Sequence, residues 1–193
     1  KCQQAASAAG QLDVDVTLTN GATEVVLITR GGMSIRFSEE DVRSMGRPAA
    51  GVRGIDLDSD DAVVGLAIVD AQARLLVAGE NGLGKRTGFD EYRLQTRGGK
   101  GIITMKTTER TGGVLGALTV READEIMLIT AGGQMVRIAV QDIRETGRNA
   151  QGVKLIELEA NDKLQGLAPV ISEDKADGEP AAPAAPPPPA VEP

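Results

Sequence analysis

The sequence predicts an all-β fold, a propeller-like array of four-stranded antiparallel blades followed by a disordered C-terminal tail. The chain of 193 residues has only three aromatic residues but 24 glycines, so its core must come from Val, Ile, Leu and Met in strands joined by turns. A pattern of about fifty residues occurs three times, which is typical of propeller arrays. The end of the chain is acidic and rich in Pro and Ala, a composition that cannot form a core.

The repeat is clearest between two segments that lie 101 residues apart. Glu24–Arg36 matches Glu125–Arg137, and a more divergent copy, shifted by 50 residues, aligns Leu75–Gly82 with Val25–Gly32. We therefore divide the chain into an entering segment with one strand (1–22), three blades (23–71, 72–122 and 123–170) and a disordered acidic tail (171–193).

Each unit is predicted to contain four short strands. In the first unit, strands at Val25–Thr29 and Met33–Phe37 flank a Gly-Gly turn, which indicates a β-hairpin. A third strand, Val52–Leu57, follows a loop that contains Gly and Arg, and a fourth, Ala62–Val69, closes the unit. The entering strand lies at Leu12–Leu18, where apolar and polar residues alternate. A single blade cannot cover both of its faces, so neighbouring blades must stack on it.

The formal net charge of −7 argues at first against a nucleic-acid partner. The tail from Ile171 carries −4 of this charge and leaves −3 on the rest of the chain. A polyanion would therefore need the cations to gather on one edge of the array.

Basic residues recur in register with the repeat, on the second strand and in the Gly-Arg loop. If blades stack, equivalent residues line up on one rim, where they can follow a DNA backbone through phosphate contacts alone. The residues predicted to bind DNA are Arg36, Arg47, Lys85, Arg86, Arg97, Lys100, Arg137 and Arg148.

A further set, Arg43, Arg93 and Arg144, recurs just before the loop. A phosphate contact and a local ion pair are both open for this set. We favour the second, with Asp41 and Asp142 pairing with Arg43 and Arg144 to set the loop.

The most compact basic loop is Gln95–Gly101, Gln-Thr-Arg-Gly-Gly-Lys-Gly. Glycine permits a tight turn and close backbone approach, and a rigid loop that carries cations and free N–H groups suits a phosphate. We expect Gln95, Gly98, Gly99 and Gly101 to form this turn.

Other chemistries find little support. With no histidine and one cysteine, a zinc site and a His-based triad are nearly excluded, and we predict neither a metal site nor a catalytic residue. Gly79–Arg86 has the spacing of a Walker A loop, but Arg86 stands where Ser or Thr would hold magnesium. Asp56–Asp61 lacks the glycine of a calcium loop and is expected to be a turn that faces away from the nucleic acid. Tyr92 is expected to pack in the core, because no base or acidic cluster surrounds it.

Three stretches resemble the C-terminal domain of the DNA gyrase A subunit: Asn81–Thr87, Lys100–Arg110 and Gly147–Val153. The resemblance spans roughly Leu12–Val170. Gln95–Gly101 is similar to that family's seven-residue box, Gln-Arg-Arg-Gly-Gly-Lys-Gly, and is interpreted as a degenerate later copy, since the family's box lies in the first blade.

This resemblance implies a β-pinwheel, in which neighbouring blades exchange a strand and DNA wraps on a basic perimeter. It implies three partners, which are double-stranded DNA, the gyrase B subunit, and the remainder of the gyrase A subunit, together with a cytoplasmic, nucleoid-associated location without a membrane. No cofactor is expected in this fragment, because ATP and Mg²⁺ act elsewhere in the holoenzyme, a type II topoisomerase that supercoils DNA. The alternatives are a protein-interaction propeller and the related domain of the topoisomerase IV A-type subunit.

Overall fold

A computed structural model of the protein describes residues 2–6, 12–46 and 48–170. Arg47, one of the predicted DNA-binding residues, and the predicted disordered tail lie outside the described residues. The described part consists of strands, turns and three short 3-10 helices and has no α-helix, so the all-β prediction is confirmed. No helix within it is long and apolar enough to cross a membrane.

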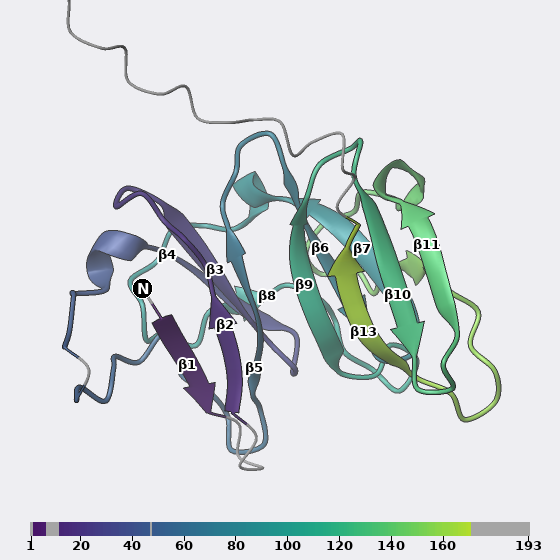
Figure 1. The fold of residues 1–193 in the computed structure, drawn as a ribbon, viewed down its shortest axis with the longest axis horizontal. Coiled ribbons are helices and arrows are strands. Elements are labelled where there is room, and N and C mark those ends of the chain that lie inside the picture. The colour runs from purple at the N-terminus through teal and green to yellow at the C-terminus, as the bar shows by residue number, and fades with distance from the viewer. Residues whose placement is uncertain (1, 7–11, 47, 171–193) are drawn as a thin grey trace, which may run out of the picture.

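The strands build three blades and a two-stranded sheet at the start of the chain (Figure 1). Blade 1 contains β3 (Glu24–Thr29), β4 (Met33–Ser38) and β5 (Val63–Ile68). Blade 2 contains β6 (Arg74–Gly79), β7 (Leu83–Gly88) and β9 (Val114–Val120). Blade 3 contains β10 (Glu125–Thr130), β11 (Met135–Ala139) and β13 (Leu164–Pro169). The first sheet pairs β1 (Cys2–Ala6) with β2 (Leu12–Val16), and β2 lies beside β5.

The outermost strand of blades 1 and 2 comes from the following repeat. Strand β8 (Ile102–Ile103) pairs with β4 of blade 1, and β12 (Val153–Lys154) pairs with β7 of blade 2. The strand exchange implied by the resemblance is therefore confirmed, whereas the expectation that each unit keeps its third strand is wrong. The loop after the second strand carries the chain back to the preceding blade, whose outer edge offers unpaired N–H and C=O groups.

The corresponding segment of the first repeat, Val52–Leu57, is a strand by sequence pattern but pairs with no sheet in the described part of the chain. Its apolar residues still pack, because Ile55 is 6% exposed in a cluster with Leu27 and Phe37. The side chains of the segment thus pack against blade 1, although its backbone pairs with no strand among the described residues.

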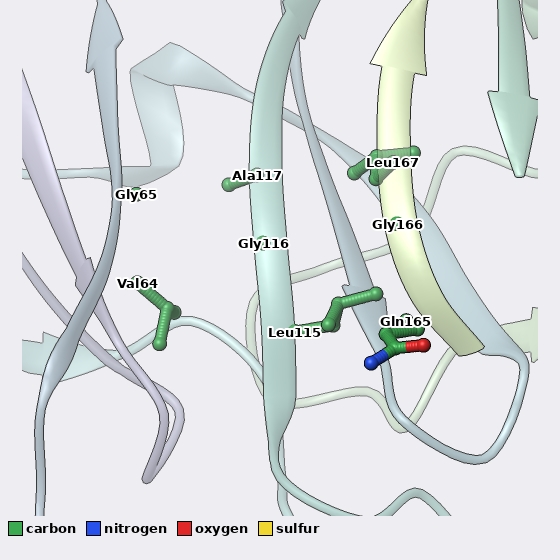
Figure 2. A pocket seen from close by; sticks show the side chains of 8 residues that line it. All are labelled: Val64, Gly65, Leu115, Gly116, Ala117, Gln165, Gly166 and Leu167. Atoms are coloured by element: carbon green, nitrogen blue, oxygen red, sulfur yellow. The ribbon is translucent and has the colours of Figure 1, made fainter. Parts of the chain in front are cut away.

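Blades stack through their inner strands β5, β9 and β13. A glycine lies at the middle of each strand, and a methyl group added at Gly65 would lie 3.3 Å from the backbone nitrogen of Ala117. An open hollow of about 300 Å³ lies where the three strands meet. Its lining, shown in Figure 2, consists of apolar and small residues, with Gln165 as the one polar side chain. Small residues here let neighbouring blades approach closely.

The core lies between blades as much as within them. Val26 and Ile28 of blade 1 pack with Leu75 and Val77 of blade 2. Blade 2 has a neighbour on each side, and β7 is buried along its whole length. In blade 3, β10 alternates buried and half-exposed residues, because only one of its faces has a neighbouring blade in the described part.

The exchange of strands requires glycine at the start of each donated strand. Gly101 has φ +75° and a methyl group there would lie 2.2 Å from the carbonyl oxygen of Ser34; the equivalent Gly51 has φ +87° and nothing within 4 Å. Gly51→Ala should therefore lower the free energy of unfolding by only about 1 kcal/mol, because alanine is disfavoured in the left-handed backbone conformation but meets no neighbouring atom. Gly101→Ala should lower the free energy of unfolding by about 3 kcal/mol, because backbone atoms must also move. Urea unfolding of both variants checks this, and equal losses would contradict it.

Candidate nucleic-acid interface

The arginines on the second strands reach across to the next repeat. Arg36 Nε donates to the Glu24 carboxylate at 2.6 Å, and its Nη1 donates to the carbonyl oxygens of Phe89 at 2.6 Å and Tyr92 at 3.0 Å. Phe89 starts the 3-10 helix η2 (Phe89–Glu91) of blade 2, and Tyr92 directly follows it. Arg36 thus links β4 to this helix. As a result, only 18% of the Arg36 side chain is exposed.

Arg86 repeats this arrangement one blade further on. Its Nε donates to the carbonyl oxygen of Ile143 at 2.6 Å, directly after the 3-10 helix η3 (Val140–Asp142), and its Nη1 donates to Glu122 at 2.6 Å. Only 6% of the side chain is exposed. Arg137, at the same position of blade 3, contacts Glu125 alone among the described residues and is 54% exposed.

Lys85 lies on β7, and its buried side chain reaches the loop of the third repeat. Its Nζ donates to the carbonyl oxygens of Gly147 at 2.7 Å and Arg148 at 2.5 Å, and the residue is fully buried. Burial lowers the pKa of Lys85 to about 8. The prediction that Lys85 and Arg86 contact phosphates is wrong. Blade 2 has neighbours on both sides, so both side chains are buried, and both already donate hydrogen bonds to carbonyl oxygens of the third repeat.

The loop arginines hold each loop to the preceding repeat. Arg97 Nε donates to the carbonyl oxygen of Asp41 at 2.9 Å, and its Nη1 donates to that of Arg53 at 3.0 Å. Arg148 Nη1 donates at 3.1 Å to the carbonyl oxygen of Ile103, which is equivalent to Arg53. Both arginines therefore contact the donated-strand segment of the repeat before them.

The box-like turn directs much of its backbone toward blade 1. Gln95 N donates to the carbonyl oxygen of Arg36 at 2.8 Å, and Gly98 N donates to that of Gly54 at 2.6 Å. Gly98 and Gly101 both have positive φ, as their role in the predicted turn requires. Gly99 adds a further link, since its carbonyl oxygen accepts from the Asp56 backbone N–H at 2.9 Å. The turn is thus a rigid joint between repeats.

Lys100 stands out from this turn and meets the acidic turn of the first repeat. Its side chain is 63% exposed, and its Nζ lies 2.5 Å from Asp58 and 3.8 Å from Asp56. The hydrogen bond that it donates to Asp58 raises the pKa of Lys100. The acidic turn therefore lies beside a residue predicted to bind DNA, and the expectation that this turn faces away from the nucleic acid stays a prediction.

The arginines that follow the 3-10 helices are exposed and have no carboxylate partner among the described residues: Arg43, Arg93 and Arg144. Arg93 donates only to the Gln95 side chain, at 3.4 Å. The expected ion pairs of Asp41 with Arg43 and of Asp142 with Arg144 do not occur, since residues two apart in a tight turn point in different directions.

These three arginines occupy equivalent positions in the three repeats. Each lies two residues after the end of its 3-10 helix, and the helices are η1 (Glu39–Asp41), η2 and η3. In Figure 1 the three helices, coloured blue, teal and green, follow one another along one side of the array. We call Arg43, Arg93 and Arg144 the arginine ladder.

The described residues include no group of three or more His, Cys, Asp or Glu side chains that could hold a metal. Tyr92 is buried, and its hydroxyl lies 2.7 Å from Thr104 Oγ1. Burial raises the pKa of the Tyr92 hydroxyl. The prediction that this tyrosine packs in the core is confirmed.

The sequence profile of a family described as DNA gyrase C-terminal domain, beta-propeller, matches residues 23–70, 73–121 and 124–171. The chain belongs to this family. It is 46% identical over 154 residues to the DNA gyrase A subunit of Salmonella typhimurium, and 44% identical over 165 residues to that of Escherichia coli K12. These alignments cover 80% and 83% of this chain but only 18% and 19% of the relatives, so the chain spans about a fifth of their length.

Solved structures agree with this family assignment. A DNA gyrase A C-terminal domain superposes with a TM-score of 0.74 at 29% identity, covering 79% of this chain and 52% of that one. The C-terminal domain of DNA topoisomerase IV superposes with a TM-score of 0.76 at 28% identity, covering 81% of this chain and 50% of that one. Fold similarity alone therefore does not separate the two topoisomerases.

Within this gyrase-family fold, the buried Lys85 makes stability depend on pH. Its folded pKa of about 8 lies below the ordinary value of 10.5, so the unfolded state binds more protons between these values. The free energy of unfolding should therefore rise with pH across this window and fall as pH decreases through 8. Glu91 and Arg148 are the charged groups beside Lys85.

Urea unfolding at pH 7.5 and 9.5 checks this dependence, with Lys85→Met as the reference that lacks the titrating group. The native chain should gain stability relative to the variant at the higher pH. An identical pH dependence of the two proteins would contradict the burial of an ionisable Lys85.

Proposed function

We propose that this chain binds duplex DNA without sequence preference along the arginine ladder, as the DNA-wrapping domain of a gyrase A subunit. The observation that supports this is the recurrence, at one position in each repeat, of an exposed arginine without a carboxylate partner among the described residues. A cation that is already paired must lose its partner to bind a phosphate, whereas these arginines need not.

One exposed arginine at the same position of each repeat suits contacts with a DNA backbone rather than the reading of a base sequence. Arg43, Arg93 and Arg144 occupy equivalent places in successive blades, so a duplex that runs along the side of the array can meet them in turn. Arginine binds phosphate with a planar fork of donors, and such contacts position a duplex without reading its sequence. The curvature of stacked blades would then bend the DNA that follows them.

The residues first predicted to bind DNA take different places in this proposal. Lys100 and Arg137 are exposed and remain candidate contacts, Lys100 in exchange for Asp58. Arg36, Arg97 and Arg148 position the ladder, since each binds carbonyl groups of a neighbouring repeat. No structural role is assigned to Arg47, which lies outside the described residues.

For the complete protein we propose the role that its relatives' name indicates. The chain would support ATP-dependent negative supercoiling by a holoenzyme of gyrase A and gyrase B subunits, with ATP and Mg²⁺ bound elsewhere. The solved gyrase A and topoisomerase IV domains are 29% and 28% identical to this chain and favour neither, so the proposal of gyrase rests on the gyrase A subunits that are 46% and 44% identical.

The arginine ladder is tested with the triple variant Arg43→Gln, Arg93→Gln, Arg144→Gln. Each lost phosphate contact should lower the slope of log K against log salt by about one, so the triple variant should lose about three. Fluorescence anisotropy with two duplexes of unrelated sequence, over a range of salt concentrations, measures this slope. Both duplexes should lose affinity alike.

A matched control removes the same number of charges from exposed cations that are already paired: Arg30, Arg121 and Lys163. Replacing these three residues with Gln should leave the slope of log K against log salt almost unchanged. Equal losses in the two triple variants would show that net charge, and not the ladder, sets the affinity. A strong preference for one duplex would also overturn the proposal.

A further inference from the structure

We propose that the loop of the third repeat binds one phosphate group of the DNA backbone, in a site that the Glu91 carboxylate fills in the free protein. We call it the loop anion site: the backbone N–H groups of Arg148 and Asn149, the Arg148 Nε and the space over Gly147. The inference rests on the proposed function, because the arginine ladder would bring the duplex to this loop.

The first argument is the orientation of the loop backbone. Lys85 Nζ donates to the carbonyl oxygens of Gly147 and Arg148, so both carbonyl groups point toward the buried lysine. In a trans peptide unit the N–H points opposite to the C=O, and the described residues contain no cis peptide bond. The N–H groups of Arg148 and Asn149 belong to these two units and therefore point away from Lys85. Successive N–H groups in a turn form a concave surface that binds anions.

The second argument is an anion that already lies on this surface. Glu91 Oε2 accepts a hydrogen bond from the Arg148 N–H at 3.1 Å. The same oxygen lies 4.0 Å from Arg148 Nε, a buried atom that makes no hydrogen bond among the described residues. The Asn149 N–H also has no partner in the described part of the chain. Carboxylate and phosphate oxygens accept from the same donors, so Glu91 lies where a phosphate oxygen would bind.

The third argument is the charge around the site. Lys85 is fully buried, the Arg148 side chain is 27% exposed, and both cations lie near the Glu91 carboxylate. A phosphate diester carries a single negative charge and can therefore replace this carboxylate without changing the charge balance. The Glu91 side chain is 44% exposed and can turn into solvent, and an exposed ion pair of this kind contributes little stability.

The site is open because residue 147 is a glycine. A methyl group added at Gly147 would lie 3.5 Å from both oxygens of the Glu91 carboxylate, so the anion lies directly over this residue. The backbone of Gly147 does not have a positive φ, and a larger side chain is therefore compatible with its conformation. Such a side chain would fill the loop anion site.

The equivalent loop of the second repeat lacks this arrangement. Ile35 stands at the position of Lys85 and offers no donor to the loop carbonyl groups. The N–H of Gly98, which is equivalent to Asn149, donates to the carbonyl oxygen of Gly54 at 2.6 Å. The buried lysine thus distinguishes the third-repeat loop, where it turns two N–H groups outward.

Glu91→Gln tests the site directly. The amide oxygen of Gln can still accept from the Arg148 N–H, so the loop is retained while the competing charge is removed. Duplex binding should tighten about threefold. The slope of log K against log salt should steepen by about one, because one more phosphate is contacted. Fluorescence anisotropy over a range of salt concentrations measures both quantities.

Two further variants separate the site from net charge. Asp142→Asn removes the same charge at the equivalent position of the third repeat, where the carboxylate has no hydrogen bond to a loop among the described residues, and should leave the slope unchanged. Adding Gly147→Leu to Glu91→Gln should return affinity and slope to the native values, since leucine fills the site without adding charge.

Amide NMR signals of Arg148 and Asn149 identify the ligand. In Glu91→Gln the duplex should shift both signals, and inorganic phosphate should shift them only at far higher concentration. Shifts that inorganic phosphate produces and the duplex does not would overturn the proposal, because the site would then bind a free anion. A native slope in Glu91→Gln, while the triple ladder variant still loses affinity, would overturn the loop anion site and leave the proposed function standing.

Discussion

The structure depends on one constraint, namely that no repeat completes its own sheet. The outer strand of blades 1 and 2 comes from the next repeat, and Arg36 and Arg86 fasten that repeat by donating to its backbone carbonyl groups. Loop arginines then reach back in the other direction, as Arg97 does toward Arg53. Adjacent repeats are therefore joined by backbone pairing, buried cations and a shared core. They form one continuous array rather than independent domains.

This constraint explains why a chain with so many arginines leaves few of them free. Carbonyl oxygens of a neighbouring repeat satisfy Arg86 and Lys85, and carboxylates hold most of the exposed cations. The arginine ladder is different, because Arg93 and Arg144 follow the two 3-10 helices, η2 and η3, that Arg36 and Arg86 hold in place. For these two residues, the cations bound to carbonyl groups fix where the exposed ones stand, which connects the stability of the array to the surface that we propose for DNA.

Much of this fold follows from sequence, whereas the roles of individual cations follow only in part. Period and alternation predict the repeats and the long strands, but a two-residue strand such as Ile102–Ile103 has too few residues to show a pattern. Register identifies equivalent arginines without telling which are buried, since that depends on carbonyl groups about fifty residues away. One signal was available for Lys85, which aligns with Ile35 and Val136, apolar residues typical of the core. The spacing of two between Asp41 and Arg43 likewise argues against their pairing.

The division between buried and exposed arginines is tested most directly by chemical modification with phenylglyoxal, followed residue by residue with mass spectrometry, with and without duplex DNA. In the free protein, Arg43, Arg93 and Arg144 should react readily and Arg86 should not. Added duplex should protect the three ladder residues and leave Arg30 and Arg121 reactive. If Arg86 reacts as fast as Arg43, or if DNA protects none of the three, the account is contradicted.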